Sequence, residues 1–141
     1  MERHFDQRRP DDEPTWVYWL DENEIQVMAG RCYVELGLPQ RAEPLLVDAV
    51  ARCDEDHARE AALYRSWLAE AYTQTGDLDR AVEEATHVVR LDARAGSARA
   101  SDRVQHLRAR LTAFRDDPTV LAFEDLYQSV ADLPGVLRPP G

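Results

Sequence analysis

Apolar side chains recur every three to four residues through most of this chain, which is the period of an α-helix. No stretch of the sequence alternates with the two-residue period of a β-strand. We expect a first helix with Asp21 as its N-cap, Glu24 completing a capping box, and Gly37 as its left-handed end. Its expected buried face falls at i, i+3, i+4, i+7, i+8 and i+11 and consists of Ile25, Met28, Ala29, Cys32, Tyr33 and Leu36.

Five more helices follow in the same pattern. The second follows Pro39 and holds Pro44 in its first turn, where a missing N–H costs little. The third ends at Gly76, Asp77 caps the fourth, and Asp117 caps the sixth. The apolar stripes of helices two to six are Leu45, Leu46, Ala49 and Val50; Tyr64, Trp67, Leu68, Ala71 and Tyr72; Leu78, Ala81, Val82, Ala85, Val88 and Val89; Val104, Leu107, Leu111 and Phe114; and Val120, Leu121, Phe123, Tyr127 and Val130.

The domain organisation follows from where this pattern stops. Residues 15–131 are expected to form one all-α domain of about six helices. Residues 1–14 are polar, and we expect a disordered acidic tail there. Residues 132–141 are rich in proline and glycine, and we expect a flexible C-terminal tail.

The helices also repeat. Residues of the same kind recur 39 positions apart, and a fixed period of this size indicates a helical array, here of three helix pairs. In the third pair the match is degenerate, because Arg115 stands where glycine is expected and Val120 where alanine is expected. The matching positions are Gly30 and Ala69, Tyr33 and Tyr72, Gly37 and Gly76, Ala42 and Ala81, Leu68 and Leu107, and Tyr72 and Leu111. The small residues among them, Gly30 and Ala69 with Ala42 and Ala81, let two antiparallel helices approach closely.

These spacings resemble the tetratricopeptide repeat (TPR). The first unit reads Ala29-Gly30-x-x-Tyr33-x-x-x-Gly37-x-x-x-x-Ala42-x-x-x-Leu46-x-x-Ala49, and the second reads Leu68-Ala69-x-x-Tyr72-x-x-x-Gly76-x-x-x-x-Ala81-x-x-x-Ala85-x-x-Val88. The resemblance covers residues 23–93 well and residues 101–130 weakly. The chain departs from the TPR pattern in its period, which is 39 and not 34, and in the early tryptophan, which Gln26 and Arg65 replace. The resemblance implies an α-solenoid that binds a protein or peptide.

A second resemblance concerns a particular group of TPR proteins. The run Pro14-x-Trp16-Val17-Tyr18-Trp19, followed by Ala29-Gly30-Arg31-Cys32-Tyr33 and Arg41-Ala42-Glu43-Pro44-Leu45-Leu46, is similar to the C-terminal TPR region of actinobacterial transcriptional regulators. Those regulators carry a helix-turn-helix DNA-binding domain of the phage-repressor type, which this sequence lacks. The resemblance therefore implies an interaction or sensory half of such a regulator.

Charge narrows the function classes. The formal net charge is −10, and all 17 basic residues are arginine. We therefore expect no direct binding of nucleic acid and no docking on anionic lipid. No apolar run is long enough to cross a membrane, no secretory signal is visible, and two cysteines are too few for a disulfide scaffold. A cytoplasmic protein is the expectation, and oligomerisation stays open.

The concave groove of a helical array is its usual binding surface. In the TPR register, the first helix of each pair turns one set of side chains toward that groove. A peptide-binding groove and a solvated face without a ligand are both consistent with this mixture of apolar, acidic and amide groups. We expect Glu70→Arg to weaken partner binding without changing thermal stability. The groove positions are Glu24, Val27, Arg31, Val34, Glu35, Leu63, Ser66, Glu70, Thr73, Gln74, Asp102, Gln105, Ala109 and Thr112.

Arginines gather in the fifth helix, and residues 94–115 carry a net charge of +5. Arg99, Arg103 and Arg110 flank its apolar stripe together with His106. These side chains either form a seam for an acidic partner or pair with acids of the preceding helix, for which Glu83 and Glu84 are the expected partners.

Other candidate sites carry less weight. The aromatic residues Trp16, Tyr18 and Trp19 either line a ligand pocket or cap the exposed end of the first helix pair. Cys53 and His57 are spaced i, i+4, but the residues between them predict a loop and not a metal site. No catalytic motif or phosphate loop occurs, so we expect neither an enzyme nor a cofactor. The function we expect is a TPR-like interaction module in bacterial transcriptional regulation or signalling; the alternative is the ligand-sensing half of a transcriptional regulator.

Overall fold

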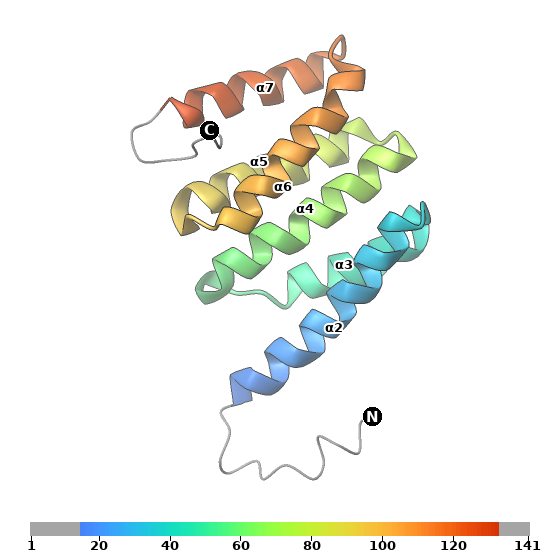
Figure 1. The fold of residues 1–141 in the computed structure, drawn as a ribbon, viewed down its shortest axis with the longest axis vertical. Coiled ribbons are helices and arrows are strands. Elements are labelled where there is room, and N and C mark those ends of the chain that lie inside the picture. The colour runs from blue at the N-terminus through green and yellow to red at the C-terminus, as the bar shows by residue number, and fades with distance from the viewer. Residues whose placement is uncertain (1–14, 133–141) are drawn as a thin grey trace.

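A computed structural model describes the backbone of residues 15–132 and the side chains of residues 22–132. Throughout this part of the chain the ordered elements are helices, so the predicted all-α class is confirmed (Figure 1). The tails predicted for residues 1–14 and beyond Asp132 lie outside the described residues. The elements are α2 (Thr15–Glu35), α3 (Pro39–Ala51), η2 (Glu55–His57), α4 (Ala58–Thr75), α5 (Leu78–Ala95), α6 (Ala98–Leu111), η3 (Thr112–Phe114) and α7 (Pro118–Ala131).

The first helix begins earlier than predicted. Helix α2 starts at Thr15, so Asp21 lies inside the helix and the predicted N-cap there is wrong. Residues 16–20 contain no glycine or proline, and nothing in them interrupts helical hydrogen bonding. The other predicted caps are confirmed, since the side chains of Asp77 and Asp117 accept hydrogen bonds from backbone N–H groups at the starts of α5 and α7.

The turns after α2 and α4 have the same construction. Gly37 has φ +73° and Gly76 has φ +81°, the left-handed conformation predicted for both. After α2, the N–H of Leu38 donates to the carbonyl of Tyr33 at 2.8 Å, and the equivalent bond recurs 39 residues later. Gly96, with φ +67°, ends α5 in the same conformation, although the sequence analysis did not single it out.

Helices α2 and α3 approach closely at Gly30, as the sequence predicts. A Cβ atom added to Gly30 would lie 2.8 Å from Cγ and Cδ2 of Leu46, which is fully buried. In the second pair, α4 and α5, the equivalent small residues are Ala69 and Ala81, and both are buried. The backbones of α6 and α7 do not approach each other as those of the first two pairs do. Arg108 stands 39 residues after Ala69 there, and long side chains span the wider gap.

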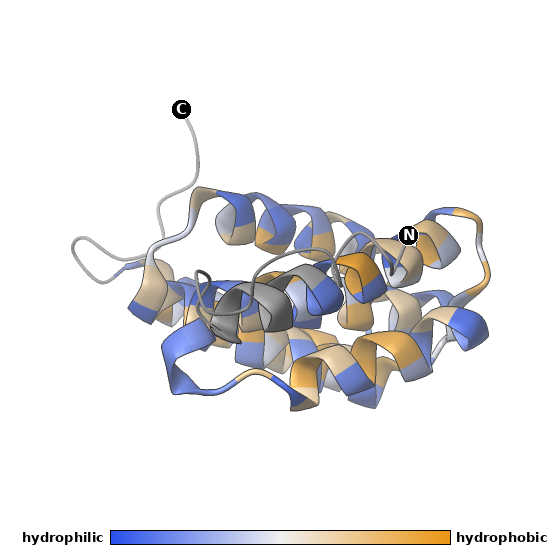
Figure 2. Cartoon of the chain, turned by 90° about the horizontal axis from the view of Figure 1, so that it is seen from below, coloured by the Kyte–Doolittle hydropathy of each residue, from blue (hydrophilic) through white to orange (hydrophobic). Residues whose placement is uncertain are grey.

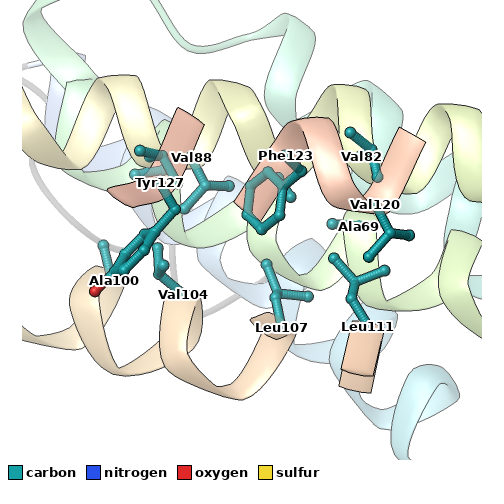
Figure 3. Packing of buried hydrophobic residues seen from close by; sticks show 13 residues of the cluster. Ala69, Val82, Val88, Ala100, Val104, Leu107, Leu111, Val120, Phe123 and Tyr127 are labelled. Atoms are coloured by element: carbon teal, nitrogen blue, oxygen red, sulfur yellow. The ribbon is translucent and has the colours of Figure 1, made fainter. Parts of the chain in front are cut away.

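The apolar core consists of two clusters that both include residues of α4. One cluster joins α2, α3 and α4 and includes Ala81 of α5, and the other joins α4 and α5 to α6 and α7. In the second, Phe123 and Val120 of α7 lie opposite Leu107 and Leu111 of α6 (Figure 3). Helix α4 lies in the middle of the molecule, between the first and the last pair (Figure 1).

The predicted buried face of α2 is wrong for four of its six residues, since only Ala29 and Tyr33 are half-buried. Ile25 is 59% exposed, Met28 63% and Leu36 70%, and Cys32 is also exposed. The buried face is on a different side of the helix and consists of Asn23, Val27, Gly30 and Val34. Helix α2 contacts α3 and α4 on that side, whereas no described helix covers the opposite side. Figure 2 views the molecule from the α2–α3 end, where the coloured helices carry hydrophobic as well as hydrophilic residues.

Candidate interaction site

The predicted groove residues do not share one accessible face. Glu24, Arg31, Glu35, Asp102, Ala109 and Thr112 are exposed, and Leu63, Gln74 and Gln105 are half-buried. Val27, Val34, Ser66, Glu70 and Thr73 are buried. The expectation that all of these side chains are open to a ligand is therefore wrong for the buried set.

The buried members have structural partners. Val27 and Val34 belong to the first apolar cluster. Ser66 and Thr73 donate their hydroxyl groups to carbonyls of their own helix, at 2.5 and 2.9 Å. Among the half-buried residues, Leu63 packs against the same cluster. The side-chain amides of Gln74 and Gln105 donate hydrogen bonds to neighbouring helices. Gln74 donates to the carbonyl of Val34, and Gln105 donates to the hydroxyl of Tyr127.

Trp67 of α4 lies between two arginines. The guanidinium carbon of Arg103, from α6, is 3.6 Å from the centre of the Trp67 ring, and that of Arg31, from α2, is 4.9 Å from it. Both distances suit a cation–π interaction. Side chains of α2, α4 and α6 are thus joined in one row, and the sequence analysis had placed Trp67 only in the apolar core.

Glu70 is the centre of the charged part of this row. Its carboxylate is 2.6 Å from Arg103, 3.2 Å from His106 and 3.8 Å from Arg110, and the residue is only 6% exposed. Glu70→Arg would remove the carboxylate that pairs with Arg103 and place a second guanidinium group beside it, so we now expect this substitution to lower thermal stability as well.

Arg103 is the most deeply held of these arginines. Besides Glu70, it donates to the hydroxyl of Ser66 at 3.0 Å and to the Ser66 carbonyl at 3.4 Å. Burial lowers the pKa of Arg103, and the hydrogen bond to Glu70 opposes that shift. Pairing within the fold is therefore confirmed for Arg103 and Arg110, but the predicted partners were wrong. Glu84 pairs instead with Arg65, at 2.7 Å.

The row keeps cationic groups in contact with solvent. Side-chain exposure is 50% for Arg31, 47% for His106 and 39% for Arg110. The ion pairs of these side chains involve Glu70, which is buried, and Glu35, which lies 3.6 Å from Arg31. We call Arg31, Trp67, Glu70, Arg103, His106 and Arg110 the arginine row. Its exposed guanidinium groups suit the planar, two-oxygen geometry of a carboxylate. Arg99, the remaining residue of the predicted seam, is exposed at the start of α6.

The other candidate residues are placed as follows. The Cys53 thiol points to the carbonyl of Ala49 at 3.5 Å, and burial raises its pKa to about 11. His57 instead contacts Asp54, with 2.6 Å between Nδ1 and the carboxylate. Within residues 22–132, no three His, Cys, Asp or Glu side chains are grouped to hold a metal ion. The side chains of Trp16, Tyr18 and Trp19 lie outside the described residues.

Comparison with known proteins adds no relative: no family model matches the chain, and neither the curated proteins nor the solved structures yield a match. None of the helices in the described part combines the length and apolar character needed to cross a lipid bilayer.

Proposed function

We propose that this chain is a non-enzymatic, TPR-like interaction module that binds an acidic segment of a protein partner along the arginine row. The observation that carries the proposal is the convergence of α2, α4 and α6 on Trp67 and Glu70, with the guanidinium groups of Arg31 and Arg110 left in contact with solvent. Arg31 and Arg110 lie on different helices, so an extended or helical peptide that reaches both would cross α4.

Electrostatics favour this surface over others on the molecule. The chain as a whole is acidic, with a net charge of −10, and most of its surface repels an acidic peptide. Glu70 neutralises part of the row, but the two guanidinium groups of Arg103 and Arg110 share that one carboxylate. The surplus positive charge gives an acidic partner a defined place to bind.

The cellular setting is a separate part of the proposal. Its only support is the resemblance of the sequence to the TPR regions of actinobacterial regulators. On that resemblance, the partner belongs to bacterial transcriptional regulation or signalling, and the interaction takes place in the cytoplasm.

The binding test uses a fluorescein-labelled hexaglutamate peptide and a hexaglutamine peptide as its neutral control. Fluorescence anisotropy should show that the glutamate peptide binds more tightly, and that binding weakens as salt is added. Replacing two exposed arginines of the row, Arg31→Ala with Arg110→Ala, should weaken binding about tenfold.

The matched control is Arg52→Ala, which removes an exposed arginine of α3 that pairs with Asp48. This variant should bind the glutamate peptide almost as the unchanged protein does. The proposal is wrong if both peptides bind equally, or if Arg52→Ala weakens binding as much as the change in the row.

A further inference from the structure

The outer side of α2 carries an apolar row that no described helix covers. It consists of Ile25, Met28, Cys32 and Leu36, spaced along one side of the helix. Three of the four are large and more than half exposed. Isolated exposed apolar residues are common, but a continuous row of them marks an interaction surface.

The internal repeat shows what the equivalent row does elsewhere in the molecule. The residues 39 positions later, Tyr64, Trp67 and Ala71 of α4, are buried against the α2–α3 pair. A further 39 positions on, Arg103 and Arg110 of α6 reach back to α4. In both cases this row of a pair's first helix is where the pair meets the preceding one. The row on α2 therefore has the position of an interface.

At the other end of the molecule, a groove of about 430 Å³ lies between α6 and α7. Its walls include Ala109, Thr112 and Leu121, which are exposed, and its floor includes the buried Phe123. We call this the α6–α7 groove.

The repeat also shows what fills the equivalent groove. The positions 39 residues before Ala109 and Leu121 are Glu70 and Val82, on α4 and α5. There α6 and α7 cover them, since Glu70 is held by Arg103 and Val82 belongs to the cluster that includes residues of both helices. The α6–α7 groove is therefore the position that a next helix pair would fill, and no described helix fills it.

The charges at the two ends are opposite. Acidic residues lie beside the apolar row of α2, at Glu22, Glu24 and Glu35. Arg108 and Arg115 line the α6–α7 groove, where Glu124 already pairs with Arg108. An acidic rim on one surface and an exposed arginine on the other favour their contact.

From the repeat and these charges, we propose that the chain associates head to tail with a second copy of itself. The apolar row on α2 of one copy docks in the α6–α7 groove of the next, as α6 docks on α4 and α5 within one chain. Because this contact joins two different surfaces, each added copy leaves one row and one groove open. Longer assemblies are therefore expected as the protein concentration rises.

Sedimentation velocity tests this, with the unchanged chain under reducing conditions so that Cys32 cannot form a disulfide. The mean mass should rise with protein concentration up to about 0.5 mM, a range that also detects weak contacts. A row variant (Ile25→Gln with Met28→Gln) and a groove variant (Ala109→Gln with Leu121→Gln) should each stay monomeric. All four substituted residues are exposed, and circular dichroism confirms that each variant folds. Val47→Gln, at an exposed apolar residue of α3 outside the row, should associate like the unchanged chain.

Mixing the two variants distinguishes a head-to-tail contact from other arrangements. The row variant keeps an intact groove and the groove variant keeps an intact row, so an equimolar mixture should form dimers and nothing larger. A groove variant that still associates would show that the row pairs with itself or with another surface, which overturns the proposal. A chain that stays monomeric over the whole concentration range, or a mixture that does, also overturns it.

Discussion

At the residue scale, Gly30 shows how one small side chain sets the distance between two helices. Leu46 of α3 is fully buried and occupies the space where a Cβ on Gly30 would be. Neither residue can move far without disturbing the first apolar cluster, because protein interiors are close-packed.

We expect Gly30→Leu to reduce the free energy of unfolding by about 1–3 kcal/mol, because the larger side chain overpacks the α2–α3 contact. Urea unfolding followed by circular dichroism measures the loss. Ala51→Leu adds the same kind of side chain at an exposed position of α3 and should change stability little. Equal stability of Gly30→Leu and the unchanged protein would mean that α2 and α3 do not approach at Gly30.

Contacts set by local spacing could be predicted from the sequence, whereas ion pairs between distant helices could not. The left-handed conformations of Gly37 and Gly76 and the close approach at Gly30 follow from local spacing, and both were predicted. The pairing of Arg103 with Glu70 joins residues 33 positions apart, and it depends on how α6 lies on α4. Spacing along one helix indicates which residues share a face, but it does not identify the neighbour across the interface. For that reason pairing within the fold was one of two alternatives for these arginines; it holds for Arg103 and Arg110, but the acids expected for it were wrong.

At the element scale, Asp92 links the end of α5 to the start of α6. Its side chain is 1% exposed and accepts hydrogen bonds from the N–H of Ser97, at 3.1 Å, and from the hydroxyl of Ser101, at 2.6 Å. Burial raises the pKa of Asp92, while the two hydrogen bonds oppose the shift. The chain reverses at Gly96 between the two helices, and the buried carboxylate of Asp92 stabilises this turn through its two hydrogen bonds.

The raised pKa predicts a pH dependence of stability. Just above the ordinary aspartate pKa, the folded protein still holds a proton on Asp92 that the unfolded chain has released. Stability contributed by this group therefore falls as pH rises through that range, and it is constant above the folded-state pKa. We expect Asp92→Asn to remove this fall, so that the stability of the variant relative to the unchanged protein rises between about pH 3 and pH 7.

Urea unfolding across this pH range gives the difference between the two proteins. Taking the difference cancels other carboxylates, such as Glu124, whose pKa is lowered by its hydrogen bond to Arg108 and which acts in the opposite direction. The control Asp125→Asn changes an exposed carboxylate of α7 and should give a difference that hardly depends on pH. If the Asp92→Asn difference falls toward neutral pH instead, the charge on Asp92 stabilises the turn.

Helix α2 shows where hydrophobic periodicity misleads at this scale. The apolar row at Ile25, Met28 and Leu36 has the spacing of a buried face, yet it is exposed, whereas the equivalent row of α4 is covered. Periodicity reports that a helix has an apolar side, but a helix at the end of an array can turn that side away from its own chain. The neighbouring helices decide which of two apolar sides is buried, and spacing along one helix does not identify them.

At the scale of the whole molecule, stability is divided between two apolar clusters that meet in α4. Helices α2 and α3 contribute residues only to the first cluster, and α6 and α7 only to the second. In such an arrangement each pair is stabilised mainly by its neighbours, so one end can open while the other stays folded.

This division predicts where hydrogen exchange changes after a substitution at one end. Phe123 is 2% exposed and lies in the second cluster, so Phe123→Ala should cost about 3–5 kcal/mol. Amide protection should then fall most in α7 and α6, while α2 and α3 keep theirs, because no residue of those two helices packs in the same cluster. Leu46→Ala, in the first cluster, should give the reverse pattern and serves as the matched comparison. If either substitution lowers protection equally in all six described α-helices, the two clusters unfold as one unit through α4.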